Sequence, residues 1–148
     1  MKKWTKSIQI NAPIEKVWEL FNQSSLDNMQ KLMPKVVSHK PVKETEQVVG
    51  SIYKQQYQEG KRIEEYDVET LDYVDESSNK KLKIGFTLAN LFNITATYEL
   101  IKIDDEKTLF TYTTTNQALK WYVKIMLFFA NDKVVKKFIK RVKKLAEE

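Results

Sequence analysis

The chain contains no cysteine, one histidine, three glycines and three prolines among its 148 residues. Without cysteine it can form neither a disulfide nor a thiolate metal site, and it has no cysteine nucleophile. Zinc-type centres need clustered histidine, cysteine or carboxylate ligands, so we expect no metal. The sequence also has no phosphate-binding glycine-rich loop, Gly-x-Ser-x-Gly elbow or dinucleotide fingerprint. It therefore predicts no cofactor.

Long apolar runs are missing as well. No segment approaches the roughly 18 uncharged apolar residues of a membrane span, and residues 1–6 are charged, with no apolar core of a secretory signal. The composition is 42% hydrophobic and 30% charged, which is typical of a folded globular chain. We therefore expect one domain over residues 1–148, located in the cytoplasm.

The excess of positive charge lies in one terminal segment. Residues 118–148 carry nine basic and three acidic side chains, whereas residues 1–117 carry 16 basic and 17 acidic ones. The net charge of +5 therefore describes a local field, not a generally basic surface. Because the lysines of residues 133–144 share a helical pattern with an apolar stripe, they are typical of a solvated helix face. This pattern disfavours nucleic acid as a partner.

The most informative segment lies near the start of the chain. Trp4, Ile8 and Ile10 alternate with polar residues, as in a half-buried strand. Pro13 then suits the first turn of a helix. Apolar residues recur at positions 14, 17, 18 and 21, which is one face of a short helix.

This strand, its Asn-Ala-Pro turn and the short helix resemble the opening of the START-like (SRPBCC) superfamily. These helix-grip proteins include Bet v 1-like allergens and polyketide cyclase/dehydrase-like proteins. The resemblance extends over residues 4–145 and implies an α+β fold with about six or seven antiparallel strands curved around a long C-terminal helix. Two short helices follow the first strand. It also implies a cavity that binds or transports a hydrophobic small molecule or lipid, and no catalytic residue carries over.

Further along, a second helix over residues 25–33 is expected to stop before Pro34. Gly60 then marks a two-residue hairpin turn that pairs Tyr57 with Glu64 and Gln55 with Tyr66. These paired residues share one face of the hairpin, and the other face is mostly charged, so we expect the first face to point inward. It holds Tyr53, Gln55, Tyr57, Glu64, Tyr66, Val68 and Thr70.

Glu64 has two interpretations. If it points inward among tyrosines, burial would raise its pKa and make it an acid/base group or a ligand contact. If it lies near the turn, it is a hydrated residue at the rim. His39, in Ser38-His-Lys-Pro41, is predicted to be a surface residue without a catalytic role, since a general base needs an orienting partner.

Alternation over residues 82–88 predicts another strand. A tight turn centred on Asp105-Glu106 pairs Tyr98 with Thr113 and places Leu100 on the same face. Both faces of these last two strands carry apolar groups, so the pattern does not decide which one is inward.

The final helical pattern changes face. Residues 118–130 are apolar nearly all round, with Lys120 and Lys124 as their only charges, and the apolar stripe beyond residue 132 is displaced by about half a turn. Either the helix breaks near Asn131, or its first half is covered on all sides. That half could cover a cavity mouth, form central core, or face outward.

The leading hypothesis is a non-enzymatic binder of an apolar molecule. Its predicted ligand-binding residues are Tyr53, Gln55, Tyr57, Glu64, Tyr66, Phe86, Tyr98, Thr113, Tyr122, Met126 and Phe129. The first alternative is a cyclase/dehydratase-like enzyme that uses Glu64 and a cavity tyrosine. The second is a membrane-surface or protein-interaction adaptor working through residues 118–130, with Lys120, Trp121, Lys124 and Phe128 outward, or a homodimer through the same segment.

Overall fold

The computed structural model describes residues 1–22, 26–128 and 131–148, with only the backbone of residues 126–128. These residues form a seven-stranded antiparallel sheet in the order β1-β7-β6-β5-β4-β3-β2. The strands are β1 Lys2–Ile10, β2 Val36–Lys43, β3 Ile52–Glu59, β4 Arg62–Asp75, β5 Asn79–Leu88, β6 Phe92–Asp104 and β7 Lys107–Ala118. The helices are α1 Ile14–Asn22, α2 Leu26–Leu32, α3 Trp121–Phe128 and α4 Lys133–Glu147.

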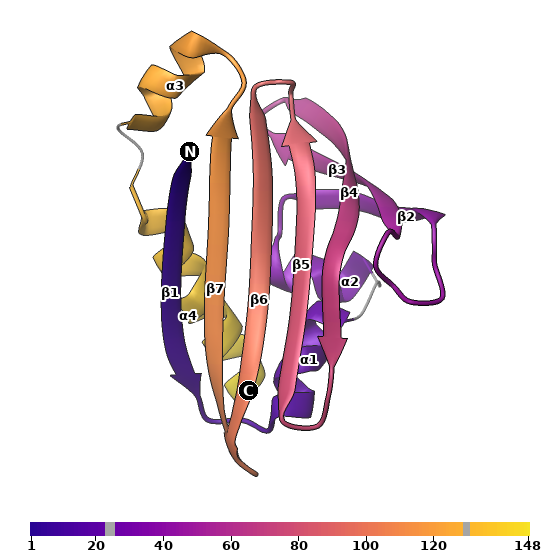
Figure 1. The fold of residues 1–148 in the computed structure, drawn as a ribbon, viewed down its shortest axis with the longest axis vertical. Helices are drawn as coiled ribbons and strands as arrows, with labels where there is room; N and C mark the ends of the chain where they lie inside the picture. The colour runs from indigo at the N-terminus through magenta and orange to yellow at the C-terminus, as the bar shows by residue number, and fades with distance from the viewer. Residues whose placement is uncertain (23–25, 129–130) are drawn as a thin grey trace.

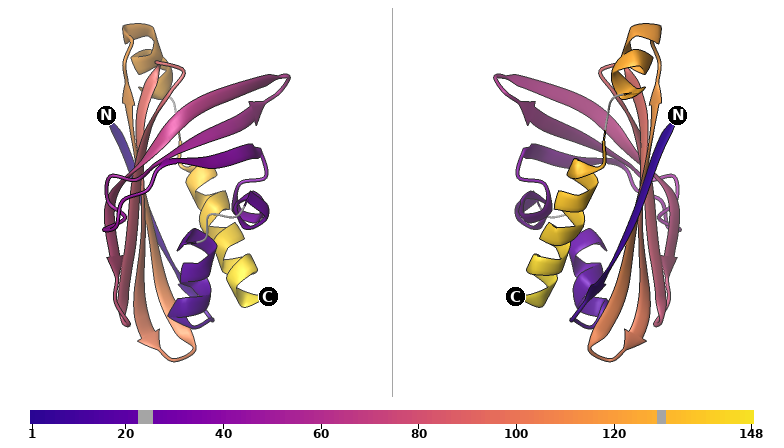
Figure 2. Two further views of the ribbon diagram at one scale, coloured as in Figure 1. Left: turned by 90° about the vertical axis from the view of Figure 1, so that its right-hand side faces the viewer. Right: turned by 90° about the vertical axis from the view of Figure 1, so that its left-hand side faces the viewer.

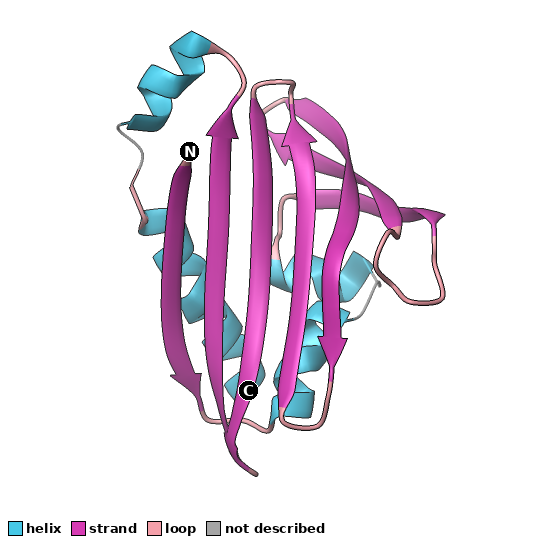
Figure 3. Cartoon of the chain, viewed as in Figure 1, coloured by secondary structure: helices cyan, strands magenta, loops and turns pink. Residues whose placement is uncertain are grey.

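The sheet is strongly curved and carries its helices on one side. Figure 1 shows the strands in front, and Figure 2 shows α1, α2 and α4 together on the hollow side, with β2, β3 and β4 bending over them. The first two strands occupy opposite edges of the sheet, so α1 and α2 span the distance between them (Figure 3). This is the predicted α+β helix-grip arrangement. Among the described residues, no helix is long and apolar enough to cross a membrane.

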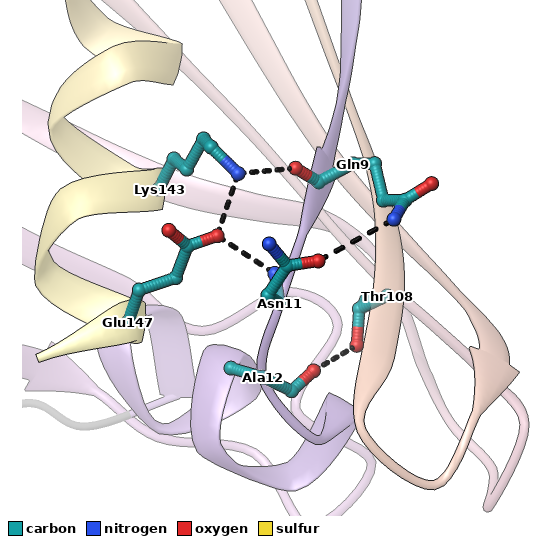
Figure 4. A network of polar contacts seen from close by, with 6 residues as sticks. All are labelled: Gln9, Asn11, Ala12, Thr108, Lys143 and Glu147. Atoms are coloured by element: carbon teal, nitrogen blue, oxygen red, sulfur yellow. Dashed lines mark hydrogen bonds and ion pairs between the residues drawn. The ribbon is translucent and has the colours of Figure 1, made fainter.

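The turn from β1 into α1 is tied to the end of α4. Figure 4 shows the contacts among Gln9, Asn11, Ala12, Thr108, Lys143 and Glu147. The backbone N–H of Asn11 donates to Glu147 Oε2 at 2.7 Å, and Lys143 Nζ contacts the same carboxylate at 2.6 Å. Thr108 Oγ1 donates to the carbonyl of Ala12 at 2.9 Å. Backbone groups left unpaired by the turn therefore find partners in elements distant in sequence.

One end of the molecule is packed solid. Fully buried apolar side chains meet there from β1, α1, β6, β7 and α4, and we call this region the closed end: Ile10, Val17, Leu100, Phe110 and Val142. The alternation of β1 places Ile8 and Ile10 in or against this core, and the helical spacing of α1 places residues 14, 17, 18 and 21 there, as predicted, whereas Trp4 lies outside it. Such burial stabilises the fold by about 1.5–3 kcal/mol for each large side chain.

A buried lysine supports the closed end. Lys80 is only 2% exposed, and its Nζ pairs with Asp75 and, at 3.0 Å, with Glu15 Oε1 on α1. The same ammonium lies 5.7 Å from the centre of the Trp18 ring. Burial acts to lower the pKa of Lys80, but the two carboxylates outweigh it and the pKa is raised. The ion pair between Lys80 and Glu15 therefore ties the β4–β5 hairpin to α1.

The hairpin at Gly60 has the predicted register. Gly60 takes a positive φ of 61°, a conformation that glycine adopts without strain. Tyr57 pairs with Glu64, and Gln55 with Tyr66. The inward placement of Gln55, Val68 and Thr70 is also confirmed, because all three are buried.

The predicted register of β6 and β7 is wrong by one residue. Tyr98 pairs with Tyr112, and Leu100 with Phe110. The turn itself pairs Asp104 with Lys107, as the sequence suggests. An irregularity between residues 102 and 104 then shifts by one residue every pair farther from the turn. A bulge of this kind adds one unpaired residue. It settles the open question of the inner face, because aromatic side chains of both strands now point the same way.

The C-terminal helix breaks near Asn131, as one alternative proposed. Asn131 and Asp132 are not helical, and Asn131 Oδ1 accepts a hydrogen bond from the backbone N–H of Lys133 at 3.0 Å. This side-chain acceptor satisfies a donor at the start of α4. α4 then buries Val135, Ile139 and Val142 against the sheet and α1.

Candidate functional site

A cavity of about 500 Å³ lies between the hollow face of the sheet and the helices, within the range of small-molecule pockets. Its strand walls are His39, Tyr53, Gln55, Tyr57, Glu59, Tyr66, Val68, Thr70, Tyr73, Leu82, Ile84, Phe86, Leu88, Ile94, Ala96, Tyr98 and Tyr112. The remaining walls are Leu20, Phe21, Asn22, Met29, Leu32, Met33, Val48, Val134 and Phe138. We call this half of the molecule the open end. Glu59, the one charged residue of the described lining, is exposed.

The structure brings together six of the predicted ligand-binding residues. Those that line the cavity are Tyr53, Gln55, Tyr57, Tyr66, Phe86 and Tyr98. They come from four neighbouring strands, β3 to β6, whose inward positions face the same space. Their shared face follows from the period-two alternation of each strand and the registers between them.

Glu64 does not join the described lining. It lies beside the turn opposite Tyr57, with its side chain 27% exposed and its Oε1 atom 3.8 Å from Arg62 Nη1. This position corresponds to the rim interpretation. The acid/base role proposed for Glu64 therefore lacks the required position, since an acid must reach the bound molecule.

Two other predicted residues also lie elsewhere. Thr113 is on the opposite face of β7, where its hydroxyl is 3.3 Å from that of Thr5; the shifted register of β6 and β7 explains this. Tyr122 is 48% exposed on α3 and is not in the described lining. Met126 (as a side chain) and Phe129 fall outside the described residues.

A short chain of hydrogen bonds connects three polar side chains in the wall of the cavity. Gln55 Nε2 donates to the Tyr66 hydroxyl at 2.8 Å, and Gln55 Oε1 lies 2.9 Å from His39 Nδ1. His39 stacks on Tyr53 at 4.8 Å between ring centres, and Tyr66 stacks on Phe86 at 4.7 Å. His39 and Tyr66 are thus each held in place by a neighbouring ring as well as by a hydrogen bond to Gln55.

With Gln55 Nε2 donating to Tyr66, the arrangement determines which nitrogen of His39 carries the proton. The Oε1 atom of Gln55 can only accept, so His39 Nδ1 carries a proton and Nε2 of the neutral ring is an acceptor. Burial lowers the pKa of His39, although its hydrogen bond to Gln55 acts in the opposite direction. Burial likewise raises the pKa of Tyr66. At neutral pH the chain is therefore uncharged, and the Tyr66 O–H remains able to donate to a bound molecule.

The expectation that His39 is a surface residue is wrong. Its position inside follows from a bulge in β2, where the register shifts between Val36 and Ser38 before His39 pairs with Gln55. The shift reverses which residues of the strand point inward. Lys40 and Pro41, which indicated a surface segment, instead reflect that β2 is the edge strand. No local pattern in the sequence marks this bulge.

Aromatic rings separate the cavity from the closed end. Tyr98 stacks on Phe21 at 4.7 Å and on Tyr112 at 5.4 Å, while Phe138 of α4 lies 4.7 Å from Tyr112. Burial raises the pKa of Tyr98 well above its ordinary value, so it stays neutral. The cavity floor is therefore a rigid, uncharged aromatic layer.

Residues 118–125 are absent from the described lining of the cavity. The sequence predicts ligand contacts from residues 118–130, through Tyr122, Met126 and Phe129. In the structure, α1, α2 and α4 form the helical walls of the described lining, through residues such as Phe21, Met29 and Phe138. Within the described part of the chain, no group of three or more His, Cys, Asp or Glu side chains could hold a metal ion.

Comparisons with known proteins agree with this geometry. A family model described as "Polyketide cyclase / dehydrase and lipid transport" matches residues 1–147. No curated protein matches the chain. Among solved structures, a truncated norcoclaurine synthase from Thalictrum flavum is similar with a TM-score of 0.71 and 16% identity, covering 99% of this chain and 94% of that one.

Two further structures have the same fold. The Zhui aromatase/cyclase from Streptomyces sp. R1128 gives a TM-score of 0.72 at 12% identity, covering 99% of this chain and 93% of that one. Ara h 8.0201 gives a TM-score of 0.68 at 12% identity, covering 98% of this chain and 97% of that one. At these identities the likeness concerns the fold alone.

Proposed function

The chain belongs to the polyketide cyclase/dehydrase and lipid transport family, within the START-like superfamily, and we propose that it binds or carries an apolar small molecule. The molecule occupies the cavity and directs one hydrogen-bonding group, such as a carbonyl, to the Tyr66 hydroxyl. We assign this activity to the cytoplasm, because a chain without cysteine suits a reducing compartment.

The observation that supports this proposal is a fixed polar chain in a mostly apolar cavity. Leu82, Ile84 and Phe86 on β5 offer only apolar contact, whereas Gln55 holds Tyr66 so that its O–H is free to donate. Binding sites of this composition use apolar area for affinity and a few polar groups for orientation. A ligand without an acceptor would leave the donor O–H of Tyr66 without a partner, although the oxygen still accepts from Gln55.

The test uses two probes of nearly equal shape, 2-acetylnaphthalene and 2-ethylnaphthalene, of which only the first carries a carbonyl. We expect the protein to bind the ketone more tightly by roughly fivefold, the value of about 1 kcal/mol for a hydrogen bond. The variant Tyr66→Phe should lose this preference. Tyr57→Phe, which removes a cavity hydroxyl outside the chain, should keep it. The proposal fails if neither ketone nor hydrocarbon binds and neither raises the melting temperature of the protein.

A second candidate is a cyclase/dehydratase-like enzyme, and the same hydrogen-bond chain favours it. Here the Tyr66 hydroxyl would protonate a substrate carbonyl while the neutral His39 accepts a proton at Nε2. Native mass spectrometry of gently purified protein separates the two candidates. For a carrier, Tyr66→Phe retains the same molecule at lower occupancy. For an enzyme, the variant retains a different molecule, the unconverted substrate.

A further inference from the structure

Helix α3 lies at one end of the molecule, beyond the last residue of β7 and far from the β6–β7 turn (Figures 1 and 2). It is anchored by the backbone N–H of Leu119, which donates to the carbonyl of Leu91 at 2.8 Å. Val123 is 1% exposed and forms the buried side of the helix. The described part of α3 is therefore held on the protein through one side.

The other side of α3 is apolar and exposed. Trp121 is 76% exposed, Ile125 56% and Tyr122 48%. At about 100° per residue these three occupy one arc of roughly 100°, opposite Val123. A helix that is apolar all round is normally buried in a core or in a membrane. Exposed apolar side chains gathered in this way mark a surface that binds a partner.

The charges beside this arc indicate the partner. Lys120, which directly precedes α3, and Lys124, within the helix, are both exposed and close to Trp121 in the sequence. Residues 107–131 contain no aspartate or glutamate. Aromatic and aliphatic side chains flanked by lysines suit the boundary between lipid headgroups and acyl chains, where anionic phosphates neutralise the lysines. We propose that α3 docks this protein on the surface of an anionic lipid membrane.

A second copy of the chain fits this face less well. In a twofold dimer the same patch meets itself, so Lys120 and Lys124 of both copies would approach one another. No carboxylate of residues 107–131 could compensate them. A membrane supplies the missing negative charge, and its interior receives the exposed rings.

The docking helix lies toward the end of α4 that lines the cavity. Val134, in the first turn of α4, is 78% exposed and at the same time lines the cavity. α4 begins just after α3 in the chain, and Figure 2 shows its first turn on the side facing α3. Membrane docking does not depend on the cavity's ligand, but it would bring this wall of the cavity close to the lipid.

The test is flotation of the full chain with vesicles of phosphatidylcholine and phosphatidylserine in a two-to-one ratio, compared with phosphatidylcholine alone. We expect binding to the anionic vesicles at low salt and its loss at about 0.5 M salt. Trp121→Ser should weaken binding roughly tenfold or more, and Lys120→Gln and Lys124→Gln roughly fivefold each. A blue shift of tryptophan fluorescence on binding should vanish in Trp121→Phe.

The matched control removes equivalent groups at the opposite end of the sheet. The double variant Ile103→Ser/Lys107→Gln, at two exposed positions next to the β6–β7 turn, should float as the unmodified protein does. The proposal is overturned if the protein ignores anionic vesicles at low salt, or if the control loses binding as strongly as Trp121→Ser. It is also overturned if sedimentation shows a dimer that Trp121→Ser dissociates.

Discussion

The closed and open ends of the sheet are built from the same alternating strands, yet one is filled and the other hollow. At the closed end, Leu100 and Phe110 are fully buried beneath Val17 of α1 and Val142 of α4. At the open end, the corresponding positions of the central strands face a cavity. Strand pattern alone therefore does not determine what fills the hollow side; the placement of the helices does.

Polar contacts separate the two ends in the same way. The closed end uses its polar groups to fasten elements together, as Glu147 does with the N–H of Asn11 and Lys80 with α1. At the open end, Gln55 connects His39 with Tyr66 within the wall of the cavity. We infer that the closed end contributes most of the stability and the open end provides recognition. Each prediction below compares a change at one end with a change at the other.

The largest difference is expected between two phenylalanine truncations. Phe110→Ala removes a fully buried ring at the closed end and should lower the free energy of unfolding by about 3–5 kcal/mol. Phe86→Ala enlarges an existing cavity and should cost only about 1 kcal/mol. Urea unfolding followed by circular dichroism measures both. Equal losses would mean that the two ends are packed alike.

The next largest effect concerns the buried ammonium of Lys80. In Glu15→Gln/Asp75→Asn the charge keeps no carboxylate partner, so the protein should lose about 1–3 kcal/mol of stability. This loss is smaller than the cost of breaking a fully buried ion pair, because the side chains of Glu15 and Asp75 are 68% and 40% exposed. The control variant is Asp72→Asn, which removes the carboxylate that pairs with Lys81, a lysine more exposed than Lys80. A comparable loss in this control would show that Lys80 has no special role.

The smallest effect is a pH dependence at the open end. Burial lowers the pKa of His39, the only histidine, below its ordinary value of 6.5. The unfolded chain therefore takes up a proton before the folded one does. Stability from the neutral ring is complete above pH 6.5 and is lost as the pH falls through the lowered folded value. Unfolding measured between pH 7.5 and 5 should show this slope, and His39→Gln should flatten it. If the slope of stability against pH is the same in His39→Gln as in the unmodified protein, the titrating group is not His39.

The comparison also shows what the sequence could predict. Regular stretches without insertions were predictable: the β1–α1 segment, because Pro13 and the change of period mark its turn, and the hairpin at Gly60, because glycine fixes its register. Single-residue irregularities were not. One near residue 103 moved Thr113 to the outer face, and one near residue 37 brought His39 inside. Such bulges are set by packing between strands and leave no local signature.

The outward face of α3 shows a different limit. The sequence identified residues 118–130 as apolar all round but left three arrangements open. Only the contacts of the folded chain decide that Val123 is buried and Trp121 exposed. For a helix without a polar face, periodicity carries no information about direction.

The most direct test of the account is a fluorescence titration with 1-anilinonaphthalene-8-sulfonate, comparing the unmodified protein with Ala96→Phe. Ala96 is 4% exposed and lines the cavity, so the larger side chain should occupy the space the probe needs. We predict one-to-one binding to the unmodified protein and its loss in Ala96→Phe, with the circular dichroism spectrum unchanged. Equal affinity in both proteins would show that the probe binds outside the cavity and would contradict the assignment of the open end as the binding site.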